Sequence, residues 1–407
     1  MKSLFTFTVA LWLLTFLPGR ASAFSSLNVF GDGLSTTTNN ANVGPLYYGK
    51  RYCNGRVWVE VLAQRQGIGI SNNWSYFGDY SSDTVANIAR FPAPADAHTA
   101  LFVVWVNNAD FVGYLNQFNP PYTSASLPAW TNAMNVSLTN YFVMTTNLYA
   151  KGARTLIMPL AVDLMEIPAY DNFAASDRSF VRQRVLSYNS AFSNILSQAA
   201  GICPGLTIYT PNTFNLLDTV LTNAAAYGLT NTIYNQGQGN VSIDAITYYS
   251  LLHLSAATNG LGTNFIFWDN LDPTAAMQEV LADYVQQIIS PASIGRVAAL
   301  NGSNRLDVVN VPVGLNGFVD GCTNLVVPNW TVVTNFITSA STNTSQSVFT
   351  LNLSATNTGS PAYSQSGIGA GKASPADIGG LPEPGGTVVV TALQFYRLRF
   401  PYAWSWP

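Results

Sequence analysis

Short apolar runs alternate with long helix-patterned segments over residues 24–290, and this alternation is the strongest constraint on the fold. The runs of strand length are 27–30, 101–106, 155–160, 206–209 and 265–268. The segments with apolar residues at helical spacing are 57–66, 130–150, 177–200 and 273–289. Strands separated by helices favour a mostly parallel sheet with helices on both faces. We therefore predict a three-layer α/β/α domain over residues 24–290. In the helix at 177–200, Asp177 is the predicted N-cap and Gly201 the predicted C-cap.

The pattern changes after residue 290, where no helical period continues. Short β-branched runs alternate with clusters of Gly, Asn, Ser and Pro, which is typical of an all-β fold. These runs are 307–313, 331–334, 347–353 and 387–392. The ending at 394–401 resembles a C-terminal strand found on many secreted proteins of environmental bacteria. We therefore predict a small β-rich domain over residues 291–407, serving as an adhesive, anchoring or stabilising module.

The first 23 residues have the pattern of a secretory signal peptide. Lys2 supplies a positive charge, an apolar stretch follows, and Ala-Ser-Ala at 21–23 is a small-residue cleavage site. No later apolar run is long enough to span a bilayer. Charged residues make up only 9% of the chain and the net charge is −3, without a Lys/Arg run, so nucleic acid is not an expected partner.

The chain has three cysteines, and an oxidising compartment would allow one disulfide between them. If a bridge forms, we expect it between Cys53 and Cys203, because both lie in the first predicted domain. Cys322 would then remain a thiol. There is no Cys-x-x-Cys pair and there are only two histidines, so we expect no zinc site and no cofactor.

The first predicted strand ends in a Gly-Asp-Gly turn, and ligands of parallel sheets bind beyond the carboxyl ends of the strands. The turn is similar to the serine turn of the GDSL (SGNH) esterase and lipase family, Phe-Gly-Asp-Ser-Leu-Ser. Five further blocks resemble the family in the same order, and the block at 49–60 is the most specific. The resemblance implies the flavodoxin-like SGNH fold, in the branch of thermolabile haemolysins and lipases. The six blocks are FGDGLS at 30–35, GKRYCNGRVWVE at 49–60, NWSYFG at 73–78, VWVNNADF at 104–111, NLLDTVLTNAAAYG at 215–228 and FWDNLDPT at 267–274.

The resemblance implies a catalytic serine, histidine and aspartate at three positions of this chain. Gly33 stands at the serine position, where it offers no oxygen to acylate. Asp272 stands at the histidine position, and a carboxylate with a pKa near 4 is a far weaker base than imidazole at pH 7. Asp269 matches the aspartate that orients the histidine. Because triad members act as a unit and contribute about a million-fold together, ordinary triad esterase activity is not expected.

Other family positions imply a binding pocket. Gly78 matches the glycine of the oxyanion hole. The family's asparagine falls on Ala109, and Asn108 beside it would reach the pocket if the loop shifts.

Carboxylates from separate blocks are expected to meet in this pocket. Crowded carboxylates raise a pKa, pair with cations or bind a metal such as Ca²⁺. The alternative is that each carboxylate has only a local structural role. Asp32 would then accept from backbone N–H groups of its own turn, and Asp272 would cap the helix that begins at Pro273. The carboxylates are Asp32, Asp110, Asp269 and Asp272.

Three other side chains could replace the missing groups. Ser35 is a possible nucleophile, although capping of the following segment is the simpler role. His98 precedes the strand at 101–106 and so falls at the wrong end of the sheet. His253 is the only imidazole that could approach the site, with a structural role as the alternative.

The sequence therefore predicts a secreted GDSL-like protein that keeps a pocket for an acyl ester or a glycan but has lost its catalytic residues. The alternative is a hydrolase acting on ester bonds with a rearranged set, in which water or Ser35 attacks and Asp272 is the base. Fold alone does not choose between these two functions.

Overall fold

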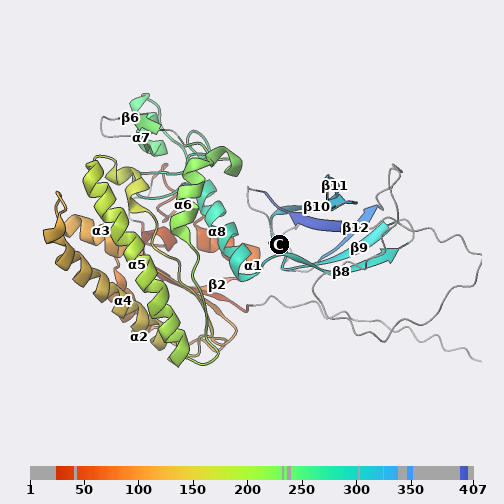
Figure 1. Cartoon of the computed structure of the whole chain (residues 1–407), viewed down its shortest axis with the longest axis horizontal. Helices are drawn as coiled ribbons and strands as arrows, with labels where there is room; N and C mark the ends of the chain where they lie inside the picture. Colours follow the sequence, from red (N-terminus) through yellow and green to blue (C-terminus); the bar gives the residue numbers. More distant parts are fainter. Residues whose placement is uncertain are drawn as a thin grey trace, which may run out of the picture.

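The computed structural model describes residues 24–40, 44–231, 233–235, 240–300, 303–323, 325–337, 346–351 and 395–401. The signal peptide expected at 1–23 and the strand expected at 387–392 lie outside the described residues. Within them, an α/β region is followed along the chain by a β-rich region (Figure 1).

A five-stranded parallel sheet forms the centre of the α/β region. The strands are β1 (Leu27–Gly31), β2 (Ile70–Ser75), β3 (Leu101–Trp105), β4 (Thr155–Ile157) and β5 (Thr207–Tyr209). Their order is β2-β1-β3-β4-β5. Both β1 and β3 are buried along their whole length, as their continuous apolar sequence requires in a sheet covered on both faces. Gly31 pairs with Trp105, so the two strands end side by side at the same edge.

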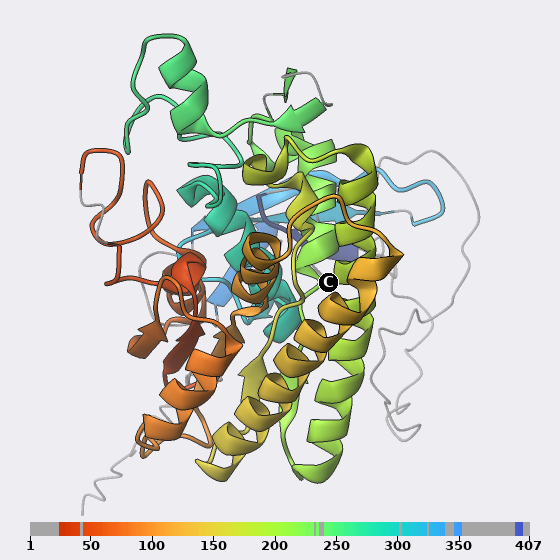
Figure 2. The ribbon, with the colours of Figure 1, turned by 90° about the vertical axis from the view of Figure 1, so that its left-hand side faces the viewer.

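Helices cover both faces of this sheet. The α/β region has the helices α1 (Trp58–Gln66), α2 (Ser81–Arg90), α3 (Asn107–Gln117), α4 (Leu127–Ala150), α5 (Ala175–Ile202), α6 (Thr213–Thr222) and α8 (Ala275–Ile289), and α7 (Ala245–Leu251) lies beyond the edge of the sheet (Figure 2). In Figure 1, α2, α4 and α5 lie on one side of the sheet, and α1 and α8 on the other. Figure 2 shows the two long helices α4 and α5 running side by side. The predicted three-layer α/β/α fold is confirmed.

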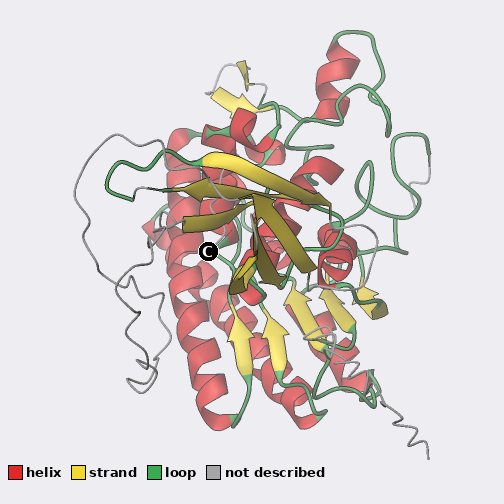
Figure 3. Ribbon diagram, turned by 90° about the vertical axis from the view of Figure 1, so that its right-hand side faces the viewer, coloured by secondary structure: helices red, strands yellow, loops and turns green. Residues whose placement is uncertain are grey.

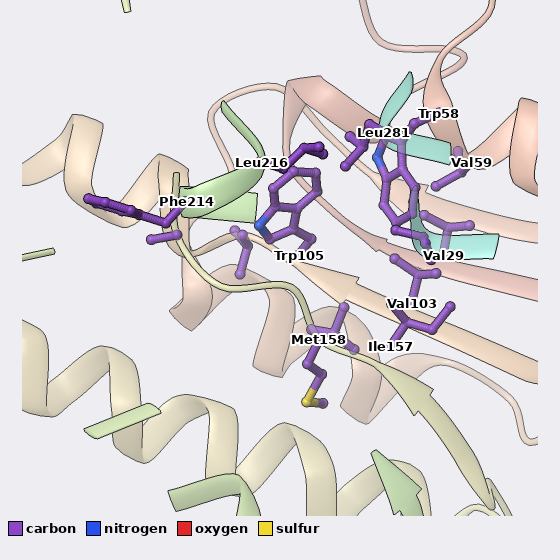
Figure 4. Packing of buried hydrophobic residues seen from close by; sticks show 14 of the residues in the cluster. Val29, Trp58, Val59, Val103, Trp105, Ile157, Met158, Phe214, Leu216 and Leu281 are labelled. Atoms are coloured by element: carbon purple, nitrogen blue, oxygen red, sulfur yellow. The ribbon is translucent and has the colours of Figure 1, made fainter. Parts of the chain in front are cut away.

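The two helix layers close over the sheet through large apolar side chains. Trp58 of α1 meets Trp105 of β3 edge to face, with ring centroids 5.5 Å apart. Figure 4 shows the Trp105 indole beside Leu216 and the Trp58 indole beside Leu281. Segments far apart in the sequence therefore meet at the carboxyl ends of the strands.

Antiparallel sheets make up the β-rich region, in front of the helices in Figure 3. One sheet has the order β12-β9-β8 and the other the order β11-β10-β13. Apolar residues from both sheets form one buried cluster, which includes Leu306, Val319 and Leu398. The strands are β8 (Ser293–Leu300), β9 (Ser303–Val309), β10 (Asn316–Cys322), β11 (Thr331–Ile337), β12 (Gln346–Leu351) and β13 (Phe395–Arg399).

A buried ion pair lies where the two regions meet. Arg65 of α1 donates from Nε to Asp283 Oδ1 of α8 at 2.6 Å, and both side chains are almost fully buried. The Arg65 Nη1 also donates to the Val313 carbonyl oxygen at 3.3 Å. The Val313 N–H donates back to the Arg65 carbonyl oxygen at 3.1 Å. One arginine thus connects α1, α8 and the start of the β-rich region.

The strand predicted at 265–268 is wrong. These residues make only isolated bridges, at Phe265 and Phe267. The backbone is instead paired locally, because the Phe267 and Trp268 carbonyl oxygens accept from the first two N–H groups of α7. The run is apolar because Phe265 and Trp268 pack in a small cluster with α7, while Ile266 and Phe267 pack into the main core without entering the sheet.

Three sequence predictions about helix ends are also wrong. Asp177 lies inside the first turn of α5, where its Oδ1 accepts from the Tyr122 N–H at 2.7 Å. Gly201 lies inside the same helix, which continues to a C-cap at Cys203. Asp272 does not cap α8, because Thr274 is the N-cap and accepts from the Met277 N–H.

The favoured Cys53–Cys203 disulfide is also wrong. All three cysteines are buried thiols. Cys203 precedes β5 and so lies at the amino edge of the sheet. Cys53 lies near the carboxyl edge, because the charge of Asp272 contributes to the raised pKa of its thiol. The two sulfurs are therefore placed at opposite ends of the sheet.

Candidate functional site

A pocket of about 160 Å³ lies beyond the carboxyl ends of the parallel strands. It receives Asp32 and Gly33 after β1 and Trp105 at the end of β3, as the topology of a parallel sheet predicts. Most of its wall is apolar. Large apolar contributions come from Leu164, Leu216, Leu217, Met277 and Leu281. The pocket can therefore hold an apolar group out of water.

Asp32 is the buried carboxyl of this pocket. Its Oδ1 accepts from the Leu34 N–H at 3.0 Å, so it caps its own turn as the local alternative predicted. Burial raises the pKa of Asp32 to about 7. Hydrogen bonds from the backbone N–H groups of Leu34 and Ala109 lower this pKa, but burial has the larger effect. The Asp32 carboxyl is thus about half neutral at pH 7.

Two further carboxyls, Asp272 and Asp269, lie together near Asp32. Burial raises the pKa of Asp272 well above its usual range, and the charges of Asp269 and Asp32 raise this pKa further. Asp272 is also hydrogen-bonded through its side chain to Asp269. Asp269 in turn accepts from the Leu271 N–H at 2.9 Å and the Asp272 N–H at 2.8 Å. Asp272 therefore keeps its proton to a higher pH than an ordinary carboxyl does, and its protonated form is held by the hydrogen bond to Asp269.

Aromatic rings cover the position of Gly33. A Cβ placed on Gly33 would lie 3.2 Å from Phe77 Cδ2 and 3.4 Å from Tyr52 Cδ2. These two rings stack with centroids 4.7 Å apart. Tyr47 meets Tyr52 edge to face and donates to Asp269 Oδ2 at 2.9 Å. A serine oxygen at residue 33 would have to displace part of this aromatic cover.

Gly78, Asn108 and Ala109 line the same pocket. Gly78 has a φ of 84°, which a residue with a side chain adopts only with strain. Asn108 reaches the pocket without a shift of the loop, and its Oδ1 accepts from the Val162 N–H at 3.0 Å. This hydrogen bond to the side-chain carbonyl of Asn108 connects α3 to the segment that follows β4.

The structure does not bring Asp110 into the pocket. Its Oδ1 accepts from the Ser81 N–H at 2.9 Å, and its other oxygen accepts from the Ser137 hydroxyl. The predicted convergence of four carboxylates is therefore wrong for Asp110, because its position on α3 turns it toward α2 and α4. Asp32 and Asp272 line the pocket, and Asp269 lies directly behind Asp272.

The proposed replacement groups are not at the pocket. Ser35 is fully buried, and its Oγ accepts from Trp58 Nε1 at 3.0 Å. His98 is exposed in the turn before β3, at the amino edge of the sheet. His253 is exposed after α7 with a φ of 57°. Neither histidine is among the described residues that line the pocket.

Within the described part of the chain, no group of three or more His, Cys, Asp or Glu side chains is arranged to hold a metal ion. Thr213 is the one hydroxyl among the described lining residues, and it donates to the Leu160 carbonyl oxygen.

Sequence reasoning missed the aromatic cover of this site. Tyr52 and Phe77 lie in two of the family-like blocks but were assigned no role there. The contact between Tyr47 and Asp269 joins residues 222 positions apart, so no local signal could have revealed it.

A family model described as GDSL-like Lipase/Acylhydrolase matches residues 27–285. The chain belongs to this family. A search of curated proteins finds no significant match. Solved structures with similar folds include an extracellular lipase from Streptomyces rimosus, at 13% identity and a TM-score of 0.39, covering 65% of this chain and 99% of that one. An acetylxylan esterase from Geobacillus stearothermophilus has 12% identity and a TM-score of 0.38, covering 66% of this chain and 96% of that one. At these values neither likeness bears on substrate.

No helix in the described residues of this family member is both long and apolar enough to cross a membrane.

Proposed function

We propose that this GDSL-like protein binds an acyl ester in its apolar pocket and does not hydrolyse it. The observation that carries the proposal is the composition of the pocket. Its described lining residues include two aspartates and one threonine, but no serine, cysteine or histidine. Nucleophilic ester hydrolysis in a triad needs an oxygen or sulfur nucleophile within hydrogen-bond reach of a base.

The degenerate positions in this proposal are Gly33, Asp269 and Asp272. Gly33 takes the place of the nucleophile and Asp272 that of the base, while Asp269 keeps its carboxylate without a histidine to orient. The aromatic cover over Gly33 supports this assignment, because Phe77 and Tyr52 occupy space beside the missing side chain. We assign ligand binding to Asp32, Gly78 and Asn108. No role in binding is proposed for Asp110.

The size and chemistry of the pocket favour an acyl chain over a sugar. An engineered cavity of about 150 Å³ in another protein takes up benzene, so a pocket of about 160 Å³ suits a chain of roughly six carbons. The apolar wall offers few partners for sugar hydroxyls, which would lose hydrogen bonds to water there. The raised pKa of Asp272 favours its protonated form, whose single O–H can donate to the carbonyl oxygen of the ester in place of Asp269.

One observation favours the alternative of a hydrolase with a rearranged catalytic set. Burial raises the pKa of Asp32 to about 7 and that of Asp272 well above its usual range, and these raised pKa values suit a base and an acid that work near neutral pH. In that mechanism Asp32 would activate water and Asp272 would protonate the leaving group. Ser35 is not available as the nucleophile, because it is buried beneath Trp58.

Hydrolysis of p-nitrophenyl hexanoate separates the two functions. The unmodified protein is expected to be inactive, and Gly33→Ser with Asp272→His to restore turnover only when Phe77→Ala makes room for the serine. Phe77→Ala alone is the matched control and should stay inactive. Activity in the unmodified protein that disappears in both Asp32→Asn and Asp272→Ala would instead establish the carboxyl mechanism.

We further propose that the protein is secreted, with residues 24–290 as the binding domain and 291–407 as a separate β-rich domain of the haemolysin-like branch. The pattern of residues 1–23 and the specific block at 49–60 support this assignment. Expression in a secreting host, followed by mass spectrometry of the protein from the medium, should give an N-terminus near Phe24. Retention of the full-length chain inside the cell would contradict it.

A further inference from the structure

The segment 245–268 forms a projection beyond the carboxyl edge of the sheet. It begins with α7, which Asp244 caps by accepting from the Thr247 N–H at 2.8 Å. Ala245, Ala256, Phe265 and Trp268 belong to a small buried cluster of its own, separate from the main core. In Figure 2, α7 stands at the outer end of the molecule, away from the long helices. The projection is therefore a folded unit with its own apolar interior.

Four leucines of this projection point outward. We call Leu251, Leu252, Leu254 and Leu261 the leucine tip; their exposed fractions are 46%, 51%, 51% and 44%. The first three are nearly consecutive at the end of α7. The fourth is carried by a loop that returns to the helix, where a Cβ on Gly262 would lie 2.6 Å from the Ala245 Cβ. The tip is thus an exposed apolar group at the end of α7, to which the loop that packs along this helix adds Leu261.

The projection carries no carboxylate, lysine or arginine that could recognise a charged partner, and His253 is its one basic side chain. The stretch 245–268 contains no Asp, Glu, Lys or Arg, and the nearest charged positions are Asp244 and Asp269 at its two ends. Exposed leucines without Lys or Arg favour insertion among uncharged lipid groups over attraction to anionic ones. A protein partner would instead use charged groups at the rim to fix its register.

The projection is continuous with the ligand pocket. Phe267, at its end, lines that pocket together with Leu271 and Asp272. We propose that the leucine tip docks the protein on a neutral lipid–water interface. Docking does not require hydrolysis, so it stands whether the pocket only binds esters or also cleaves them.

Flotation with phosphatidylcholine vesicles tests this docking on the full protein. Leu252→Asp with Leu254→Asp should weaken vesicle binding by at least about tenfold, since each buried leucine contributes strongly to partitioning. Leu186→Asp is the matched control, because Leu186 is 40% exposed on α5, outside the projection. It should bind as the unmodified protein does. Phosphatidylserine vesicles should bind no more tightly than neutral ones.

A second measurement guards against a folding defect in the double variant. The three native cysteines are buried, so a single Leu252→Cys can be labelled selectively with an environment-sensitive dye. Its emission should shift to the blue on addition of phosphatidylcholine vesicles, and a label at Leu186→Cys should not shift. The proposal would be overturned by equal shifts at both sites or by a failure of the unmodified protein to bind vesicles. It would also be overturned if the protein forms an oligomer that the double Asp variant dissociates and no vesicle binding is seen.

Discussion

Replacing Asp32 with asparagine should flatten the dependence of stability on pH. Burial raises the pKa of Asp32 from 3.8 to about 7, so the folded protein holds a proton that the unfolded chain has lost over this interval. The contribution of Asp32 to stability is therefore complete below about pH 4 and declines until the pH passes about 7. At 1.36 kcal/mol per pH unit, the decline over this window is about 4 kcal/mol.

Urea unfolding between pH 4.5 and 7.5 measures this contribution. The unmodified protein should lose stability across the measured window, and Asp32→Asn should remove about 3 kcal/mol of that loss, because about 1 kcal/mol of the decline falls below pH 4.5. Asparagine keeps the carbonyl oxygen that accepts from the Leu34 N–H, so the turn itself is preserved. In a domain of this size, the variant should melt roughly 8 °C higher than the unmodified protein at pH 7.5.

Asp96→Asn is the matched control for this experiment. Hydrogen bonds from Ser25 and Ser26 lower the pKa of Asp96, so its titration lies below the measured window in both folded and unfolded chains. Its slope between pH 4.5 and 7.5 should equal that of the unmodified protein. If Asp32→Asn also leaves the slope unchanged, Asp32 is hydrated and ionised in the folded state and the reasoning is refuted.

Three further perturbations test other parts of the account. Arg65→Met leaves the Asp283 carboxyl buried without its cation and should lower the free energy of unfolding in urea by about 3 to 5 kcal/mol. Adding Asp283→Leu to this variant should recover most of the loss. Equal stabilities of the single and double variants would contradict this coupling. Thiol titration with a bulky disulfide reagent should find no reactive cysteine in the folded protein and three after unfolding without reductant; one after unfolding would indicate a disulfide. Tyr47→Phe removes the hydrogen bond to Asp269 and should cost about 1 kcal/mol, while Tyr48→Phe, at a half-exposed neighbour, should cost almost nothing. Equal effects at the two tyrosines would argue against the Tyr47 contact.

The two strands with the clearest sequence pattern are those buried on both faces. The runs at 27–30 and 101–106 are continuous and apolar because helices cover both sides of the sheet there. β2 escaped prediction because it is an edge strand with polar residues such as Asn72 and Asn73. The run at 265–268 is as apolar as a central strand but is divided between the main core and the small cluster with α7, and periodicity alone does not distinguish these environments from a sheet.

The position of the site was more predictable than its detailed contacts. The family-like blocks placed Gly33, Gly78 and Asp272 at the ends of consecutive elements, and all three line one pocket. Asp110 could not be placed in this way, because the turn of α3 that carries it decides which neighbours it meets. The contact between Tyr47 and Asp269 depends on the packing of a loop near the start of the chain against one near its end.

The most direct test of whether the pocket binds an ester without cleaving it is native mass spectrometry. The protein is mixed with p-nitrophenyl hexanoate and the mass of the complex is measured. The account predicts a one-to-one complex with the mass of the intact ester, which persists for hours. Filling the pocket by Ala109→Trp should abolish that complex, since Ala109 lines the cavity. A protein carrying a covalent hexanoyl group, or the appearance of free hexanoate at a rate above that of buffer, would contradict the account.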